Sequence, residues 1–516
     1  MALLGAGYRG FMTRPNLLFV MADQLAASFL PSYGHPIVKA PALDQLSQRG
    51  VRFDSAYSNS PLCAPARFAM MAGQLNSRIG AYDNASELAS SVPTFAHYLR
   101  AAGYQTCLVG KMHFIGPDQL HGFESRLTTD IYPADFGWTP NWDDAERRIA
   151  GWFHNMDSVV NAGIAEATNQ LDYDDDVGFQ AERKLRDLAR PGDDRPWMLT
   201  VAFTHPHDPY VMRQQYWDRY DHDDIDLPRV GPLPIETVDP HSLRLRNVSA
   251  MDEVGVNEQH VRNARHAYYA AVAYIDDRVA ALLDTLERCG MADDTIVVFT
   301  SDHGDMLGER GLWYKMNFFE GACRIPLFVA GPGITPGDAP EHVSLLDVLP
   351  TLLELAGVER PDGIDGHSLV PLLGGDRDPE RTVLGEYLAE GAVAPILMIR
   401  RHNWKYVYCA ADPPQLFDVA ADPEELANLA SDPACADTAS QFEKEVLTRW
   451  DPEAIREAVV ASQRARRTVN AALRCGQYTS WDYRPVIDPS QQFVRNHHDL
   501  DDVERSRRLV SPARLT

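Results

Sequence analysis

The stretch NLLFVMADQ, residues 16–24, is a short apolar run that ends in a carboxylate and an amide. An uninterrupted apolar run of this length predicts a strand buried on both faces, which is typical of parallel sheets covered by helices. Asp23 follows the last apolar residue and therefore lies at the carboxyl end of the predicted strand. Ligands of open α/β sheets bind at that end.

The same pattern recurs along the chain, with predicted helices between the apolar runs. The further runs stand in TCLVG (106–110), WMLTVAF (197–203), TIVVFT (295–300) and PLFVA (326–330). Helices are predicted over residues 94–103, 257–288 and 344–357 from their amphipathic periodicity. Strands that alternate with helices predict an α/β fold with a large mixed, mostly parallel sheet flanked by helices.

The sequence changes character from about Gly385, where antiparallel strands and a helix near residues 440–474 predict a smaller C-terminal α+β subdomain. We expect a leader over residues 1–12, a catalytic domain over 13–384, the subdomain over 385–490 and a tail over 491–516. The proline-containing stretch 221–259 has weak periodicity and is interpreted either as a loop or as a lid.

Composition excludes some classes of partner. The 516 residues include 73 acidic and 48 basic side chains, a formal charge of −25, which argues against nucleic acid. An acidic surface disfavours an anionic substrate less if that substrate also carries a positive group. Seven scattered cysteines without a CxxC pair predict a reducing compartment. No apolar run has membrane-spanning length, so we predict a cytoplasmic protein with no membrane partner.

Two predicted strands end in acidic residues that suit a metal ion. Asp23 and Gln24 follow the first strand, and Asp302 and His303 follow the strand at 295–300. Oxygen ligands with one imidazole suit Ca²⁺, Mg²⁺ or Mn²⁺. Each acid has a plainer interpretation, as a helix cap or a polar strand end. Their recurrence after two separate strands favours one metal site.

Five cationic or imidazole side chains also lie beside predicted strand ends, in an otherwise acidic chain: Arg67, Lys111, His113, His207 and Lys315. Taken singly, such residues are usually solvated or structural. Together they predict a site that binds a tetrahedral oxyanion and stabilises charge on a leaving oxygen. The two histidines suit proton transfer near neutral pH.

Cys63 begins the segment CAPAR, residues 63–67, and has no cysteine nearby to pair with. A buried structural cysteine is the default interpretation, but Pro65 and Arg67 do not explain it. The segment resembles the C-x-P-x-R motif of the sulfatases of the alkaline-phosphatase superfamily. That resemblance implies that a formylglycine-generating enzyme oxidises Cys63 to an aldehyde. Ala64 and Ala66 depart from the small hydroxyl residues more usual there.

Other stretches extend this resemblance over nearly the whole chain from Arg14: MADQ, GKMH, THPHDPY and SDHGDMLGERGLWYK. Gln24 departs from the second aspartate that most members carry. The resemblance implies an alkaline-phosphatase-like fold and a divalent metal, with Ca²⁺ expected and Mg²⁺ or Mn²⁺ as alternatives. The implied metal ligands are Asp23, Gln24, Cys63, Asp302 and His303, and the implied catalytic residues are Cys63, Arg67, Lys111, His113, His207 and Lys315.

Within the family, the sequence is most similar to the choline sulfatase subgroup, as judged from residues 59–84, 110–142, 385–401 and 484–504. The resemblance implies choline O-sulfate as substrate and a homo-oligomer, expected to be a tetramer, whose tail reaches a neighbouring protomer. The implied substrate-binding residues are Trp138, His154, Asn496 and Asp499. An aromatic face attracts a trimethylammonium group by about 0.5–2 kcal/mol, although ordinary packing would also account for Trp138.

The expected reaction is hydrolysis of choline O-sulfate to choline and sulfate. The hydrate of the oxidised Cys63 attacks sulfur while three cations hold the sulfuryl oxygens: Arg67, Lys111 and Lys315. His207 with Lys315 protonates the departing choline oxygen, and His113 acts as the base that releases sulfate.

Three other activities stay open at this point. A phosphodiester or phosphonate monoester hydrolase, or another alkyl or aryl sulfatase, would share the scaffold but have no evident use for Trp138 and His154. A two-zinc phosphatase would carry a serine or threonine nucleophile and a second metal in place of Lys111, His113 and Lys315. A non-catalytic choline- or betaine-binding protein would keep Cys63 as a thiol.

Overall fold

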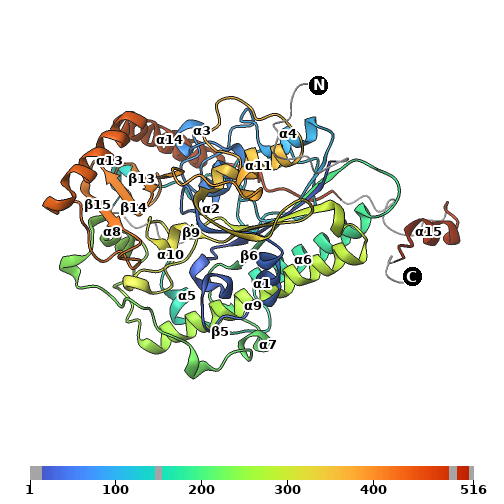
Figure 1. Cartoon of the computed structure of the whole chain (residues 1–516), viewed down its shortest axis with the longest axis horizontal. Helices are drawn as coiled ribbons and strands as arrows, with labels where there is room; N and C mark the ends of the chain where they lie inside the picture. Colours follow the sequence, from blue (N-terminus) through green and yellow to red (C-terminus); the bar gives the residue numbers. More distant parts are fainter. Residues whose placement is uncertain (1–13, 146–153, 487–496, 511–516) are drawn as a thin grey trace.

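The computed structural model describes residues 14–145, 154–486 and 497–510. A nine-stranded sheet crosses the middle of this described part (Figure 1), in the order β11-β2-β10-β8-β1-β6-β3-β4, with β9 beside β2. The strands are β1 (Asn16–Asp23), β2 (Gly50–Tyr57), β3 (Gln105–Gly110), β4 (Ser125–Arg126), β6 (Trp197–Pro206), β8 (Thr295–Ser301), β9 (Arg324–Ile325), β10 (Leu327–Ala330) and β11 (Gly337–Ser344).

The predicted mixed, mostly parallel sheet is confirmed. Strand β1 pairs in parallel with β6 and β8, β3 pairs in parallel with β6 and β4, and β11 pairs in parallel with β2. The antiparallel pairs are those of β10 with β2 and β8, and that of β9 with β2. The parallel strands β1, β3, β6 and β8 therefore present their carboxyl ends at one edge of the sheet.

Helices cover both faces of the sheet, which explains why β1 is apolar throughout. Leu18 and Val20 belong to one core cluster, whereas Leu17 and Phe19 belong to the other. In Figure 1 one set of helices lies below the sheet: α1 (Pro41–Gln48), α6 (Asn169–Leu188) and α9 (Glu258–Arg288). A second set lies above it: α2 (Cys63–Ala72), α4 (Phe95–Ala101) and α11 (Val348–Leu355).

A smaller antiparallel sheet follows, as predicted, in the order β12-β13-β14-β15. Its strands are β12 (Thr382–Tyr387), β13 (Ile396–Arg401), β14 (Trp404–Cys409) and β15 (Asp412–Asp418). The single helix expected near residues 440–474 is instead two helices, α13 (Ala436–Arg449) and α14 (Pro452–Leu473). Pro452 lacks an N–H and stands in the first turn of α14, while the Asp451 side chain caps that helix by accepting from Ala454 N. The chain therefore starts a new helix there.

The stretch 221–259 holds a helix that the sequence did not predict. It contains the 3₁₀ turns η4 (His222–Asp224) and η5 (Ile235–Thr237) and the helix α8 (Pro240–Val248). Arg244 forms an ion pair with Asp412 of β15, and His241 Nε2 donates to the Met316 carbonyl at 2.7 Å. This stretch therefore ties the C-terminal sheet to the loop that follows β8.

The remaining elements are short connections. They are η1 (Ala27–Phe29), η2 (Pro31–Tyr33), α3 (Asn76–Ile79), η3 (Trp142–Asp144), α5 (Asp157–Val160), β5 (Gly163–Ile164), β7 (Val211–Met212), α7 (Gln214–Trp217), η6 (Ala292–Asp294), η7 (Glu309–Gly311), α10 (Glu320–Cys323), η8 (Leu345–Asp347), α12 (Val370–Leu373), η9 (Pro433–Cys435) and α15 (Leu500–Arg507). Within the described ranges, no helix has both the length and the apolar character needed to cross a membrane.

Candidate active site

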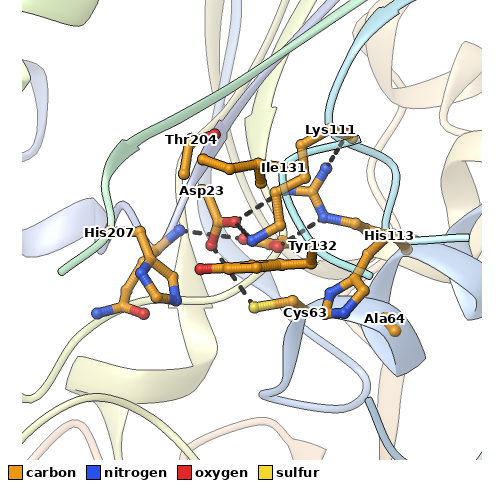
Figure 2. Close-up of polar contacts among 12 residues, drawn as sticks. Asp23, Cys63, Ala64, Lys111, His113, Ile131, Tyr132, Thr204 and His207 are labelled. Atoms are coloured by element: carbon orange, nitrogen blue, oxygen red, sulfur yellow. Dashed lines mark hydrogen bonds and ion pairs between the residues drawn. The ribbon is translucent and has the colours of Figure 1, made fainter. Parts of the chain in front are cut away.

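Four charged side chains meet, fully buried, at the carboxyl edge of the sheet (Figure 2). Lys111 Nζ contacts Asp23 Oδ2, Arg67 Nη2 lies 3.4 Å from the same oxygen, and Arg67 Nε donates to Asp302 Oδ2 at 2.9 Å. Burial acts to raise the pKa of Asp23, but the charges of Lys111 and Arg67 outweigh it and hold that pKa well below its usual range. Asp23 is therefore a carboxylate, as a metal ligand must be.

Gly110 brings Lys111 into this cluster. It ends β3 with a φ of 101°, and a Cβ at that position would lie 2.0 Å from the Ala202 carbonyl oxygen of β6. Only glycine fits so close to β6 in this backbone conformation. Lys111 can therefore leave the strand and turn toward Asp23.

Several non-glycine residues around the cluster have left-handed backbone conformations. Gln24 has a φ of 66° and His113 a φ of 62°, and Tyr314 (66°) and Met316 (77°) stand on either side of Lys315. Each such residue costs on the order of 1–3 kcal/mol and persists only where its surroundings fix it. Strain of this kind concentrates at functional sites, and here the strained backbone orients Gln24, His113 and Lys315.

Asp23, Cys63, Asp302 and His303 place one possible ligand atom each within 4.8 Å of one another. The Cys63 Sγ–His303 Nε2 distance is 3.2 Å. His303 Nδ1 lies 3.0 Å from the Gly304 carbonyl, which can only accept, so Nδ1 carries the proton and Nε2 presents its lone pair to the cluster. Two carboxylates and one imidazole fit a divalent cation.

Gln24 stands beside this ligand set. Its Oε1 accepts from Lys315 Nζ, and its Nε2 donates to Asp305 Oδ2 at 2.7 Å. These bonds fix which way the amide points, with the oxygen toward Lys315. Whether that oxygen also coordinates a metal stays a prediction.

Cys63 is the first residue of α2 and is 1% exposed. Burial, together with the nearby Asp23 charge, raises the pKa of the Cys63 thiol to about 11. The thiol is therefore protonated near neutral pH, and a protonated thiol is both a poor nucleophile and a poor metal ligand. Unmodified Cys63 is not suited to the chemistry that its position implies.

A cavity of about 360 Å³ opens beside Cys63. It brings together four residues that the sequence predicted for the site, Cys63, Trp138, His154 and His207. The rest of its lining consists of Asn84, Ile131, Tyr132, Asn155, Ser158, Thr168, Asn169, Gln170, Asp208, Pro209 and Glu390. Asp499 is exposed, caps α15 by accepting from Asp502 N at 3.1 Å, and is not part of this lining; Asn496 lies outside the described residues.

Aromatic rings line one side of the cavity. The Tyr132 ring packs edge-on against Trp138 with centroids 5.0 Å apart, and Lys111 Nζ lies 4.3 Å from the Tyr132 centroid. The ring centroids of His113 and Trp138 lie 5.8 Å apart, and neither nitrogen of His113 has a hydrogen-bond partner among the described residues. Burial and the charge of Lys111 lower the pKa of His113 to about 3, so the ring is neutral and can accept a proton.

His207 and Lys315 form a directed pair. His207 Nδ1 lies 2.6 Å from the Asp208 carbonyl and must donate to it, which leaves Nε2 to accept from Lys315 Nζ at 2.7 Å. Burial and the charge of Lys315 hold the pKa of His207 well below its usual range, so the imidazole is neutral. Lys315 Nζ also donates to Gln24, which leaves one of its three N–H groups for a ligand.

Sequence reasoning missed Glu390, which is 4% exposed and lines the cavity. Its Oε2 has no hydrogen-bond partner in the described part of the chain. Burial, with a contribution from the Asp83 charge, raises the pKa of Glu390 to about 7. The available signal was a single acid in the otherwise apolar stretch LAEGAVA, residues 388–394. Tyr132 and Asp208 were also missed, although Tyr132 stands within the stretch 110–142 and Asp208 within THPHDPY.

Comparison with known proteins agrees with this geometry. The sulfatase family model matches residues 15–358, the model of the choline sulfatase C-terminal region matches residues 457–509, and that of the N-sulphoglucosamine sulphohydrolase C-terminal region matches residues 308–451. The first of these covers every predicted residue of the buried ion cluster.

Individual relatives point the same way. The chain is 52% identical to a choline-sulfatase of Rhizobium meliloti (strain 1021), covering 96% of this chain and 98% of the relative. It is 28% identical to arylsulfatase K of Danio rerio, covering 79% and 78%.

Among solved structures, a phosphonate monoester hydrolase of Agrobacterium radiobacter matches with a TM-score of 0.67 and 24% identity, covering 84% of this chain and 95% of that one, which shows a shared fold. A buried cluster of two carboxylates, Lys111 and Arg67 around the cysteine of a C-x-P-x-R motif thus coincides with a family match over most of the chain, and the protein belongs to the sulfatase family.

Proposed function

We propose that this sulfatase hydrolyses choline O-sulfate to choline and sulfate. The observation that carries the proposal is the cavity itself, because Cys63, Trp138 and Glu390 all line it, and Oε2 of Glu390 has no hydrogen-bond partner among the described residues. A sulfate group suits the buried cations around Cys63, and a quaternary ammonium suits Trp138 and Glu390. The similarity to a relative named choline-sulfatase supports the same substrate.

At the sulfate end, Arg67, Lys111 and Lys315 supply positive charge where the sulfuryl oxygens would lie. Such preorganised charge stabilises a transition state without reorganisation during the reaction. When bound, a divalent ion and the oxidised Cys63 side chain would supply the polarised nucleophile; Asp23, Asp302 and His303 would hold the ion, with Gln24 beside them. The neutral His113 would take up a proton when sulfate is released.

Lys315 would supply the proton to the departing choline oxygen. Its ammonium group is oriented by His207 Nε2 and Gln24 Oε1, which leaves one N–H for the substrate. His207 cannot supply that proton from Nε2 in the arrangement described, because its proton lies on Nδ1. The imidazole therefore orients the Lys315 ammonium group, and the Lys315 amine regains a proton from solvent after choline leaves.

The trimethylammonium group of choline would be recognised by a negative charge and by aromatic contact. Trp138 and Tyr132 line the cavity, and the face of such a ring attracts a trimethylammonium group by about 0.5–2 kcal/mol. Glu390 adds a buried carboxyl whose Oε2 has no hydrogen-bond partner among the described residues. An aryl sulfate gains nothing from a carboxylate at this position.

The first experiment compares kcat/KM for choline O-sulfate, nitrophenyl sulfate and an aryl phosphodiester, using protein co-expressed with a formylglycine-generating enzyme. Choline O-sulfate is expected to be strongly preferred. Glu390→Gln should lower its kcat/KM by about 30-fold or more, since losing one partner of a buried charge pair costs about 2 kcal/mol or more.

Trp138→Ala should act in the same direction, and Leu447→Ala, at an exposed position on α13, serves as the control. Both pocket variants should leave nitrophenyl sulfate turnover within a few-fold. A preference for the phosphodiester would instead support a phosphonate monoester or phosphodiester hydrolase. Absence of any turnover, with a free thiol at Cys63, would support the binding protein.

The pH dependence of choline binding tests the role of Glu390 directly. Because burial raises the pKa of Glu390 to about 7, its carboxylate forms as the pH rises through that value. The inhibition constant of choline against nitrophenyl sulfate hydrolysis should tighten about tenfold between about pH 6 and pH 8, in proportion to the ionised fraction. In Glu390→Gln the constant should be flat; a wild-type profile equally flat would exclude this role.

We propose calcium as the resident ion, with magnesium or manganese as alternatives, because the donors are mostly oxygen. Exhaustive chelation is expected to lower turnover about 100-fold or more, since Lewis-acid stabilisation is worth several kcal/mol. It should also lower the thermal midpoint, and calcium should restore both quantities better than zinc does. Full turnover by protein shown by elemental analysis to hold no divalent ion would contradict the proposal.

The assembly and processing of the chain are part of the same proposal. We infer a cytoplasmic homotetramer with a catalytic domain over residues 13–384, a C-terminal subdomain over 385–490 and a tail over 491–516 that meets a neighbouring protomer near Asn496 and Asp499. Light scattering of the purified protein measures the oligomeric state. The same measurement on a chain ending at residue 490 tests whether the tail contributes to assembly. A monomeric full-length chain would exclude the tetramer.

A further inference from the structure

One turn of helix α14 holds a buried arginine that bonds two segments near the cavity. Arg466 is 6% exposed, and its Nη1 and Nη2 each donate to one carboxylate oxygen of Asp83 at 2.7 Å. Its Nη1 also lies 3.3 Å from Thr139 Oγ1. Asp83 is fully buried. A bidentate guanidinium–carboxylate pair of this kind fixes both distance and orientation.

One turn earlier on α14, Gln463 bonds a third segment. It is 1% exposed, and its Oε1 accepts from the Trp142 backbone N–H at 2.8 Å. The Trp142 indole in turn donates from Nε1 to the Ala389 carbonyl at 2.9 Å. The glutamine therefore acts on the segment around Ala389 through a single buried tryptophan.

Asp83, Thr139 and Ala389 are each a direct neighbour, along the chain, of a residue that lines the cavity. Asp83 precedes Asn84, Thr139 follows Trp138, and Ala389 precedes Glu390. Two of these lining residues are the ones assigned to the ammonium group. If this turn of α14 moved, the residues bonded to it would move as well, and so would the lining residues that adjoin them in the chain.

The sulfate-binding part of the site has a connection to α14. Asp23 ends β1, Lys111 follows β3 and Asp302 follows β8. Asn84, next to Asp83, accepts from the Ala64 N–H beside Cys63 at 2.9 Å, so Arg466 also bears on the nucleophile segment. Gln463 bonds Trp142 and, through it, the segment that precedes Glu390.

We propose that Arg466 and Gln463 are positioning residues that set the geometry of the cavity wall facing the quaternary ammonium, so that helix α14 determines substrate preference while residues at the edge of the sheet perform the chemistry. This proposal rests on the proposed function. Neither residue touches substrate; each acts through the main chain next to Trp138 or Glu390. A misplacement of about 1 Å can cost about 100-fold in rate, so loss of either bond should be visible in specificity.

The test uses the full-length, matured protein with Arg466→Met and Gln463→Met, which keep the length of the side chain but remove the bonds. Arg456→Met is the matched control, because Arg456 lies on the same helix in an exposed pair with Glu453. The measurements are KM and kcat for choline O-sulfate and for nitrophenyl sulfate, with the inhibition constant of choline. The ratio of the two kcat/KM values does not depend on the matured fraction.

Each buried variant is expected to lower that ratio at least about 10-fold, through a higher KM for choline O-sulfate and weaker choline inhibition. In Gln463→Met nitrophenyl sulfate turnover should stay within about 3-fold, as should every parameter of Arg456→Met. Arg466→Met is expected to lower nitrophenyl sulfate turnover as well, because Asp83 adjoins Asn84, which bonds Ala64. A merely structural role would lower both activities together and leave KM and the inhibition constant unchanged.

Should Arg466→Met fail to fold, because it leaves Asp83 buried without its partner, Gln463→Met decides the question. A ratio within about 3-fold of wild type in that variant overturns the proposal. If the wild type itself shows no preference for choline O-sulfate, the proposed function fails; a wild-type preference that both variants retain contradicts only the role of α14.

Discussion

Replacing Cys63 by serine is expected to reduce steady-state turnover by a factor on the order of 10⁴ or more, the size of loss seen when a catalytic nucleophile is removed. Serine has an oxygen at the right position, so one attack on sulfur remains feasible. It has no second hydroxyl on the same carbon, and the sulfate ester formed on the introduced serine therefore has no internal route to release. Mass spectrometry of the peptide around residue 63 should show one added sulfuryl group.

Two comparisons sharpen this prediction. Cys63→Ala should lose the same turnover without acquiring any mass, because it has no oxygen. Thermal stability of both variants should stay near that of the unmatured wild type, since a buried side chain of similar size is retained or one atom is lost. Rapid multiple turnover by Cys63→Ser would contradict a release step that depends on the oxidised side chain.

The second large effect is expected at Lys315. Lys315→Met should lower kcat for choline O-sulfate by about 10²- to 10⁴-fold, the usual worth of a general acid. Choline leaves as an alkoxide that needs a proton, whereas nitrophenolate is stable without one. The same variant should therefore lower nitrophenyl sulfate turnover by a much smaller factor.

His207→Asn provides the companion measurement, because an amide oxygen can keep one hydrogen bond to Lys315 but holds the ammonium group less rigidly than the imidazole does. It should be less damaging than Lys315→Met and should show the same dependence on the leaving group. An equal loss for both substrates in Lys315→Met would mean that Lys315 serves only to hold sulfuryl oxygens.

The sequence predicted the strand-end residues well because local rules apply to them. Asp23, Lys111 and Asp302 each follow an apolar run, and parallel strands place such positions at one edge. The C-x-P-x-R resemblance added Cys63 and Arg67, whose roles neither periodicity nor composition could supply. The Asp451–Pro452 pair could also have predicted the break between α13 and α14, because it is typical of a helix start. Helical periodicity on both sides of the pair led instead to the prediction of a single helix.

The pocket wall could not be predicted in the same way. Glu390 stands alone in an apolar stretch, and only the fold shows that it faces a cavity rather than solvent. The bond between Arg466 and Asp83 joins residues 383 positions apart, a separation at which hydrophobic periodicity carries no information. Under the proposed function, specificity would depend on contacts between distant segments, whereas the chemistry would depend on residues at the strand ends.

The burial of the Cys63 segment has a consequence for how the protein must be made. Cys63 is 1% exposed and Arg67 is fully buried in the folded chain, so no second enzyme can grip that segment once α2 has packed against the sheet. A formylglycine-generating enzyme would therefore have to oxidise Cys63 before α2 packs, during or soon after translation. Under the proposed function, the fraction of chains that such an enzyme matures would therefore be set before folding is complete.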